Sequence, residues 1–186
     1  MQVRWASLGS FHLNLHPTNV LRRRNGIRGT TRSIAVAACS EEATVEASVR
    51  IVSWNVNSIR ARLPRVLDWL EEWKPDVLCV QETKVLDGHF PREEFEARGY
   101  HLEVFGQKTY NGVALIGRQA PDEVVRGLPD DSEEADKRLI GGRYGELWIW
   151  NAYVPNGTEL GTPRFDYKLE WFRRMRALLE RRHHPG

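Results

Sequence analysis

Residues 51–84 have the sequence IVSWNVNSIRARLPRVLDWLEEWKPDVLCVQETK, in which two short apolar runs flank a stretch with helical spacing. The runs at 50–56 and 76–81 predict buried strands, because both are short and rich in Ile and Val. Between them a helix is predicted over 63–73, with Pro64 in its first turn and Pro75 past its end. Its apolar face is formed by Leu63, Val66, Leu67, Leu70 and Trp73. Two buried strands joined by one helix are expected to lie parallel, so this segment predicts an α/β fold.

Polar side chains stand where the two predicted strands end. The C-terminal ends of parallel strands open onto the same edge of a sheet, where α/β proteins bind ligands. Asn55 and Glu82 are therefore expected to lie side by side. A carboxylate flanked by amides can form part of a binding site for a hard divalent cation. Such a cation also takes oxygen ligands from substrate phosphates.

The remaining pattern predicts further strands and helices. A helix is predicted over 91–98, with Gly99 as its C-cap, followed by strands at 101–105, 112–117, 122–126 and 146–154 and a helix over 164–182. An Asn-Gly pair predicts the turn between the strands at 101–105 and 112–117. The strand at 146–154 has apolar residues on both faces, and one of these faces also carries Asn151 and Tyr153. Such a pattern is typical of a strand that is covered on both sides. The last helix is expected to bury Leu169, Phe172, Met175 and Leu179. The acidic segment 130–136 is predicted to be a solvated loop, with a metal cluster as the alternative.

Composition bounds the class of protein. The chain has 186 residues, 41% hydrophobic and 28% charged, which is ordinary for one globular domain. No apolar run reaches the roughly 18 residues that a membrane span needs. Cys39 and Cys79 are the only cysteines and support neither a disulfide framework nor a zinc site, so a reducing compartment is favoured.

The N-terminal stretch differs from the rest of the chain. Residues 1–40 hold six arginines and no Lys, Asp or Glu, while the remaining residues carry a small net negative charge. This composition indicates that residues 1–48 are a leader of the transit-peptide kind, for a chloroplast or a mitochondrion. The alternatives are a disordered tail or a wrongly assigned start, and the protein would then be cytoplasmic. Residues 49–186 are predicted to form the folded domain.

Four strings in order carry a family resemblance: SWNVN at 53–57 with IRAR at 59–62, QETK at 81–84, YNGVAL at 110–115 and YVPNG at 153–157. Over about 49–182 the chain resembles the exonuclease III family of apurinic/apyrimidinic endonucleases, within the endonuclease/exonuclease/phosphatase superfamily. GQK at 106–108 and the acidic loop before RLI at 138–140 are similar to its bacterial branch.

The resemblance implies a role for eight residues. Glu82 would be the direct ligand of Mg²⁺ or Mn²⁺, Asn55 would lie at the metal, and Tyr153 would contact the scissile phosphate. The supporting residues would be Asn57 as a second polar group, Lys84 beside Glu82, Arg60 and Arg138 as phosphate contacts, and Asn156 in the DNA groove. Each has a structural alternative: a turn-capping Asn, a solvated Glu or Lys, or a core tyrosine with a satisfied hydroxyl.

These roles fit phosphodiester hydrolysis. A hard cation polarises a phosphoryl oxygen and stabilises the leaving oxygen, and a phenol donates to the charge that develops. The resemblance therefore implies a DNA-repair nuclease that cleaves double-stranded DNA at abasic sites and from 3′ ends. It also implies no membrane association, and a monomer for the full-length protein.

The family fold is a four-layer α/β sandwich, of which this chain is expected to supply a part, a mixed sheet with its outer helices, with the C-terminal half missing. The inner face of that sheet is then expected to be exposed. The family's Gly-Asp-x-Asn segment and its terminal Asp-His pair do not occur here, so the 186-residue chain is expected not to cleave abasic DNA. One alternative is a non-catalytic module that binds nucleic acid or protein. Another is a different phosphoesterase, such as an inositol phosphatase or sphingomyelinase, but these tend to carry a histidine in place of the YVPNG string.

Overall fold

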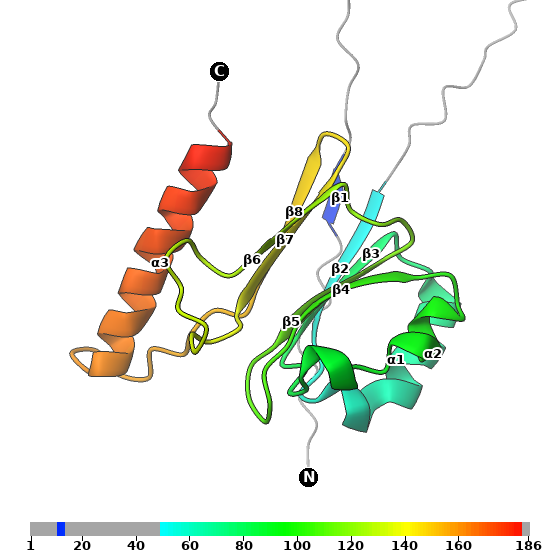
Figure 1. The fold of residues 1–186 in the computed structure, drawn as a ribbon, viewed down its shortest axis with the longest axis horizontal. Coiled ribbons are helices and arrows are strands. Elements are labelled where there is room, and N and C mark those ends of the chain that lie inside the picture. Colours follow the sequence, from blue (N-terminus) through cyan, green and yellow to red (C-terminus); the bar gives the residue numbers. More distant parts are fainter. Residues whose placement is uncertain (1–10, 14–48, 184–186) are drawn as a thin grey trace, which may run out of the picture. The chain divides into compact units, whose positions relative to one another are not determined.

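The computed structural model describes residues 11–13 and 49–183 (Figure 1). The leader predicted for residues 1–48 lies outside the described residues, except for the three-residue strand β1 (Phe11–Leu13). Among the described residues, no helix is both long and apolar enough to cross a membrane. The domain predicted from residue 49 onward is described up to residue 183.

The first sheet contains the two strands that the sequence singled out. Its strands follow the order β2 (Val49–Asn55), β3 (Val77–Gln81), β5 (Val113–Gly117) and β4 (His101–Phe105). β2 runs parallel to β3, in a register that places Asn55 opposite Gln81, and the other neighbours are antiparallel. The predicted parallel pair is confirmed, within a mixed sheet.

The second sheet is antiparallel, with β7 (Leu139–Tyr144) between β6 (Glu123–Arg126) and β8 (Leu147–Ala152). The sequence did not predict β7, because two adjacent glycines weaken its strand propensity. The glycines leave room for neighbours on both faces of the strand. A Cβ on Gly141 would lie 2.6 Å from the ring of Trp150, and one on Gly142 would lie 2.8 Å from Leu115. Packing therefore requires glycine where propensity disfavours it.

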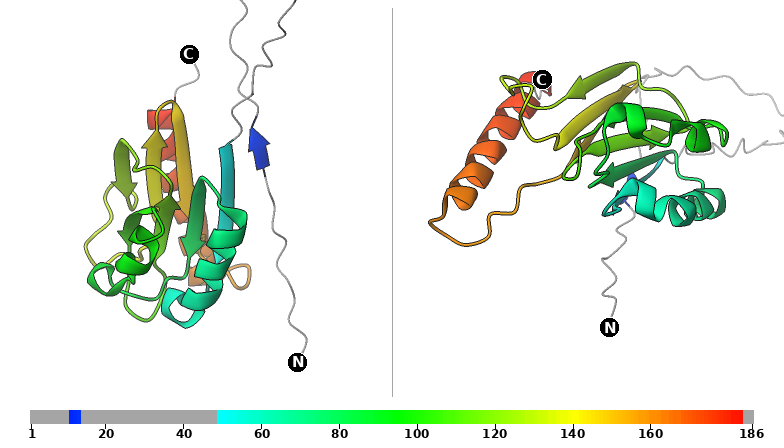
Figure 2. Two further views of the ribbon diagram at one scale, coloured as in Figure 1. Left: turned by 90° about the vertical axis from the view of Figure 1, so that its right-hand side faces the viewer. Right: turned by 60° about the horizontal axis from the view of Figure 1, so that its bottom comes forward.

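The layers follow from three buried clusters. The first sheet buries one face against α1 (Ile59–Trp73) and α2 (Arg92–Glu96), with the 3₁₀ turn η1 (Asp87–His89) beside them. Its other face packs on the second sheet, and that sheet's outer face packs on α3 (Pro163–Arg182). Figures 1 and 2 show the helices on the two outer sides of the paired sheets. The predicted four-layer α/β sandwich is confirmed.

One expectation about the sandwich is wrong. The inner face of the first sheet is not exposed, because β7 and β8 cover it. Val77, Cys79 and Leu115 of the first sheet are buried against Ile140 and Ile149 of the second. Burial between the sheets raises the pKa of the Cys79 thiol to about 12, which leaves it protonated and unreactive near neutral pH. The chain supplies strands to both sheets, since it passes from the first sheet to the second between β5 and β6, at residues 118–122.

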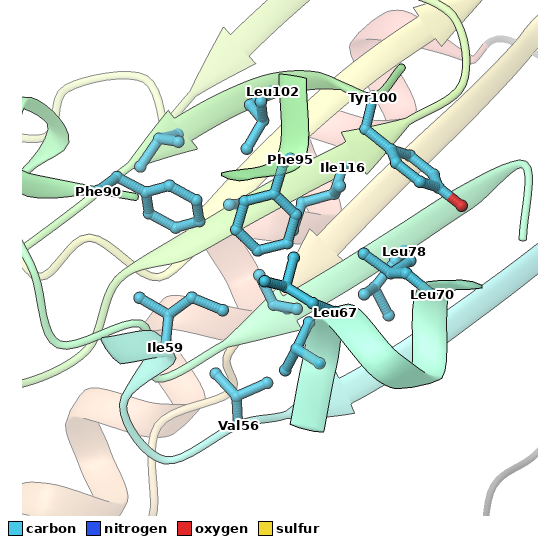
Figure 3. Close-up of a cluster of buried hydrophobic side chains, with 14 of the residues drawn as sticks. Val56, Ile59, Leu67, Leu70, Leu78, Phe90, Phe95, Tyr100, Leu102 and Ile116 are labelled. Atoms are coloured by element: carbon cyan, nitrogen blue, oxygen red, sulfur yellow. The ribbon is translucent and has the colours of Figure 1, made fainter. Parts of the chain in front are cut away.

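The helical side of the first sheet forms a dense apolar core (Figure 3). Ile59, Leu70 and Phe95 from the helices meet Leu78 and Ile116 from the strands, all at most 1% exposed. Burial of one such side chain contributes about 1.5–3 kcal/mol. This core holds the connection from β2 to β3, and with it the strand ends that carry Asn55 and Glu82.

Two helices differ from their predictions at identifiable residues. α1 begins at Ile59, four residues before the predicted start, because the hydroxyl of Ser58 accepts a hydrogen bond from the Ala61 amide; Pro64 is then inside the helix. α2 ends at Glu96, and Gly99 adopts its left-handed conformation in the turn that follows.

The predicted buried face of α3 is wrong for Leu169 and Phe172, whereas Met175 packs, partly buried, against the second sheet as predicted. Trp171 and Leu178 are buried, whereas Leu169 and Phe172 are 38% and 42% exposed. The side of α3 that faces the second sheet differs from the predicted side for two reasons. Trp171 places its larger ring against the sheet, and Arg174 on the same side binds Asp131 at 2.7 Å.

Candidate active site at the ends of β2 and β3

Backbone hydrogen bonds continue the pairing of β2 and β3 past the ends of the strands. The amide of Val56 donates to the carbonyl of Gln81 at 3.0 Å. The amide of Ser58 donates to the carbonyl of Glu82 at 2.7 Å, and that of Ile59 to the carbonyl of Thr83 at 3.1 Å. The loop after each strand is thus fixed against the other. This pairing sets the spacing between the side chains that the loops carry.

Several residues at this edge have left-handed backbone conformations. The φ angles are 45° at Asn57, 55° at Glu82 and 55° at Lys84. A non-glycine residue in this region costs on the order of 1 kcal/mol and persists only when the surroundings impose it. Here the loop hydrogen bonds impose it. Such strain is concentrated at functional sites in proteins.

The carboxylate of Glu82 is the centre of the site. Its Oε1 accepts from Nδ2 of Asn55 at 2.7 Å and from the hydroxyl of Tyr153 at 2.8 Å. Its Oε2 lies 3.0 Å from Nζ of Lys84. The predicted adjacency of Asn55 and Glu82 is confirmed, and Tyr153 and Lys84 join the same group.

The charge state of Glu82 follows from these contacts. Partial burial is the largest single influence and acts to raise the pKa of the carboxyl. Hydrogen bonds from Asn55, Lys84 and Tyr153, together with the charge of Lys84, outweigh it and hold the pKa below the ordinary 4.5. Glu82 is therefore ionised at neutral pH, as a ligand of a hard cation must be.

Asn57 and Lys84 support the carboxylate from one side. Lys84 donates to Oδ1 of Asn57, and the backbone amide of Asn57 donates to Oδ1 of Asn55 at 3.1 Å. In this arrangement the oxygen of Asn55 faces the backbone and its nitrogen faces Glu82. Asn55 thus orients the carboxylate, and its role as a metal ligand stays a prediction.

Tyr153 reaches the site from the other sheet. Its amide donates to the carbonyl of Arg138 at 2.7 Å, and the Arg138 guanidinium lies 4.8 Å from the centre of its ring. Partial burial, followed by the hydrogen bond to Glu82 and the charge of Glu82, raises the pKa of the phenol above its ordinary 10, while Arg138 opposes this. The phenol therefore stays protonated near neutral pH and can donate to an anionic oxygen.

The two remaining predicted residues lie at the periphery. Arg60 is exposed in the first turn of α1. Asn156 is also exposed, and its Oδ1 accepts from the amide of Thr158 at 3.0 Å. Among the described residues, no hydrogen bond joins Arg60 or Asn156 to Glu82 or Tyr153. Their roles toward DNA stay predictions.

The sequence interpretation missed a buried polar pair directly behind the site. Nε2 of Gln81 donates to Oδ1 of Asn151 at 2.6 Å and to the hydroxyl of Ser53 at 3.1 Å. Nδ2 of Asn151 donates to the carbonyls of Val80 and Ala114, each at 2.9 Å. Gln81 is 8% exposed and Asn151 2%. The available signal was a polar residue on the apolar face of each predicted strand, because a buried polar group needs a partner.

The acidic segment 130–136 is not simply a solvated loop. Asp131 accepts from the Leu128 amide at 2.8 Å and binds Arg174, while Asp136 binds Arg138 at 2.9 Å and Asn111 at 2.9 Å. Both aspartates find cationic partners, Asp131 in Arg174 far along the chain and Asp136 in Arg138 two residues on. Among the described residues, no group of three or more His, Cys, Asp and Glu side chains could hold a metal ion, so no metal cluster of this kind forms there.

Comparisons with known proteins show what the chain is similar to. Residues 52–186 match the Endonuclease/Exonuclease/phosphatase family. The chain is 36% identical over 140 residues to an exodeoxyribonuclease III of Haemophilus influenzae, covering 73% of this chain and 52% of that protein. The chain is 30% identical over 152 residues to a DNA-(apurinic or apyrimidinic site) endonuclease of Dictyostelium discoideum. This match covers 80% of this chain and 42% of that protein.

Solved structures show the same similarity. A 3′ phosphatase, NExo, from Neisseria bound to a product DNA hairpin matches with a TM-score of 0.68 at 37% identity, covering 71% of this chain and 51% of that one. An AP endonuclease from Archaeoglobus fulgidus matches with a TM-score of 0.67 at 41% identity, covering 72% of this chain and 51% of that one. The chain spans about half the length of the relatives it matches.

Proposed function

Since the chain belongs to the endonuclease/exonuclease/phosphatase family, we propose that it carries the metal-binding and phosphate-binding half of a DNA-repair nuclease site. The substrate is double-stranded DNA, cleaved at abasic sites and from 3′ ends, and the cation is Mg²⁺ or Mn²⁺. The supporting observation is the ionised Glu82 carboxylate held between Asn55, Lys84 and Tyr153. Relatives that are named as nucleases favour this function over a non-catalytic binding module.

The residues fit a hard divalent cation. Glu82 supplies an ionised, partly exposed carboxylate at the edge of the sheet, with side-chain exposure of 19%. An Mg²⁺-like ion bound through one or two carboxylates keeps several waters and takes oxygens from the substrate phosphate. When bound, the cation stabilises negative charge on the phosphate and on the leaving oxygen. Lys84 occupies the second carboxylate oxygen and is the group that a cation would displace.

The side chains of the site have different roles in phosphate binding. Asn55 and Lys84 keep the Glu82 carboxylate ionised and oriented toward the open edge. Tyr153 places a protonated phenol 2.8 Å from the same carboxylate, so a phosphate oxygen beside Glu82 lies within reach of a hydrogen bond from this donor. Arg138 adds positive charge across the phenol ring.

Hydrolysis also requires a base for the attacking water, and such a base contributes about 10²- to 10⁴-fold. Within residues 49–183, Glu82 and Asp136 are the carboxylates in contact with Tyr153 or Arg138, and both are engaged by neighbouring cations. These residues therefore bind and polarise a phosphate better than they activate water. We expect the 186-residue chain to bind the cation and the duplex and to nick abasic DNA at most in traces.

The test separates binding from cleavage. Bound Mn²⁺ is counted from the loss of its electron paramagnetic resonance signal, for the wild type and for Glu82→Gln. A fluorescent duplex with a tetrahydrofuran abasic site reports binding by anisotropy and nicking on a denaturing gel. We expect Mn²⁺ binding in the wild type and at least tenfold weaker binding in Glu82→Gln, as expected for the loss of one charged ligand. Equal Mn²⁺ binding by both proteins would contradict the proposal that Glu82 binds the metal. Rapid nicking would contradict the expectation that these residues do not activate water.

For the leader, we propose import into a chloroplast or a mitochondrion, supported by the six arginines and the lack of Lys, Asp and Glu in residues 1–40. Residues 1–48 fused to a fluorescent protein are expected to carry it into one of these organelles. A fusion that stays in the cytoplasm would overturn the proposal.

A further inference from the structure

Two hydrogen bonds, in addition to the contact with the ring, hold the Arg138 guanidinium across Tyr153. Its Nε donates to Oδ2 of Asp136 at 2.9 Å, and one terminal nitrogen donates to the Tyr153 carbonyl at 3.4 Å. The Arg138 side chain is only 14% exposed. Because a guanidinium carries five N–H donors, these two contacts leave other donors of the fork for an anionic oxygen.

Asp136 is itself fixed by a buried side chain. Its other oxygen, Oδ1, accepts from Nδ2 of Asn111 at 2.9 Å, and Asn111 is 7% exposed. The same Nδ2 donates to Oε1 of Gln107 at 3.0 Å, and the Lys137 amide donates to that oxygen at 3.0 Å. The orientation of Asp136 is thus set on both sides, by Asn111 and by Arg138.

Asn111 also connects this network to the Glu82 loop. Its backbone carbonyl accepts from the amide of Lys84 at 3.0 Å, and the carbonyl of Gly112 accepts from the amide of Thr83 at 3.1 Å. Asn111 has a left-handed backbone, with φ of 51°, that its Asn-Gly turn provides. One turn therefore contacts the loop that carries Glu82 through its backbone and the Arg138 side of the site through its side chain.

We propose that Asp136, held by Asn111, is a positioning residue that sets the guanidinium of Arg138 across Tyr153. Arg138 and Tyr153 then act as one anion-binding unit beside Glu82. The proposal rests on the proposed function for the identity of the anion, a DNA phosphate. It goes beyond that function by assigning a task to the acidic loop, which the sequence predicted to be a solvated loop or a metal cluster.

The chain offers a matched control in Asp131. It lies in the same loop and forms the same kind of ion pair, to Arg174 of α3, at 2.7 Å. Asp131→Ala and Asp136→Ala therefore change the net charge equally, which matters because added positive charge strengthens nonspecific DNA binding. Any difference between the two variants isolates the position of the charge.

The first readout is spectroscopic and independent of DNA. The Nε–H signal of Arg138 is assigned in an amide-type correlation spectrum by its loss in Arg138→Lys. We expect this signal to be protected from exchange with water in the wild type and in Asp131→Ala. We expect it to move to the position of solvated arginines in Asp136→Ala, and to be restored, at least in part, in Asp136→Glu, which retains the charge. An Arg138 signal that is unchanged in Asp136→Ala would overturn the proposal.

The second readout is a double-mutant cycle on binding of the abasic duplex at fixed salt. Relative to Asp131→Ala, we expect Asp136→Ala to bind about tenfold more weakly, the effect of one charge-assisted hydrogen bond. In an Arg138→Ala background, Asp136→Ala is expected to cost nothing further. Additive losses would overturn the proposal.

If the wild type does not bind the duplex, the proposed function fails, and the Arg138 signal still decides the positioning role. If Asp136→Ala unfolds, Asp136→Asn, which keeps the shape of the side chain, takes its place in both measurements.

Discussion

The pair of buried amides behind the site yields a sharp prediction about folding. Replacing Asn151 by Leu keeps a side chain of similar bulk between the two sheets, so little cavity forms. The change removes the donor to the carbonyls of Val80 and Ala114 and the acceptor of the Gln81 amide. The variant therefore isolates the polar contribution of one residue that joins the first sheet to the second.

The magnitude follows from counting the hydrogen bonds that are lost. Asn151 makes three of them, to Gln81, Val80 and Ala114, and each contributes about 0.5–1.5 kcal/mol. Gln81 keeps the Ser53 hydroxyl and the Cys79 carbonyl as acceptors, and Val80 and Ala114 stay paired in the β3–β5 ladder. Burial of the added apolar surface of Leu returns about 1 kcal/mol. We expect a net loss of about 2–3 kcal/mol in the free energy of unfolding, which lowers Tm by roughly 5–10 °C.

Urea unfolding followed by tryptophan fluorescence measures this loss, with an unchanged denaturant slope as the sign that the unfolding transition is the same. Ser53→Ala is the matched control, because it removes one hydrogen bond to the same Gln81 at the exposed side of β2. It is expected to cost less than about 1 kcal/mol. An Asn151→Leu variant as stable as the wild type would refute the reasoning that this network joins the sheets.

Three further predictions concern the site and the second sheet. The folded-state pKa of Glu82 lies below its ordinary 4.5, so its ionised form stabilises the fold above that value and the contribution is lost as pH falls through the lowered pKa. The difference in unfolding free energy between the wild type and Glu82→Gln is therefore expected to be constant above about pH 5 and to shrink below it; a difference that grows with acid would contradict the assignment. Lys84→Met removes the ammonium that competes for the carboxylate, so Mn²⁺ is expected to bind roughly fivefold more tightly by paramagnetic resonance, whereas Lys108→Met on the exposed turn leaves the affinity unchanged. Gly141→Ala places a Cβ 2.6 Å from the Trp150 ring and is expected to destabilise the protein by about 1–3 kcal/mol in thermal unfolding, while Gly88→Ala, with open space around it, stays within about 0.5 kcal/mol of the wild type.

The parts of the fold and site that the sequence predicted correctly depend on neighbours along the chain. Apolar runs of strand length on either side of a helical period predict two parallel strands, and the parallel arrangement brings Asn55 and Glu82 to one edge without further information. The four-layer sandwich and the approach of Tyr153 came from the resemblance, since nothing local to residues 146–154 indicates which partner its hydroxyl finds.

What the sequence left open was decided by contacts between distant residues. β7 forms although its two glycines disfavour a strand, because Trp150 and Leu115 need the space that the glycines leave. α3 presents Trp171 instead of Phe172 to the sheet: the two rings point about 100° apart around the helix, and the opposing sheet and the pairing of Arg174 with Asp131 decide which one is buried. Asp136 joins the site for a similar reason: Arg138 is only two residues away, but the orientation of the carboxylate is set when the fold brings Asn111 beside it. Hydrophobic periodicity along the chain thus determined most of the elements, whereas side-chain packing and charge pairing across the two sheets determined β7 and which faces and polar groups meet.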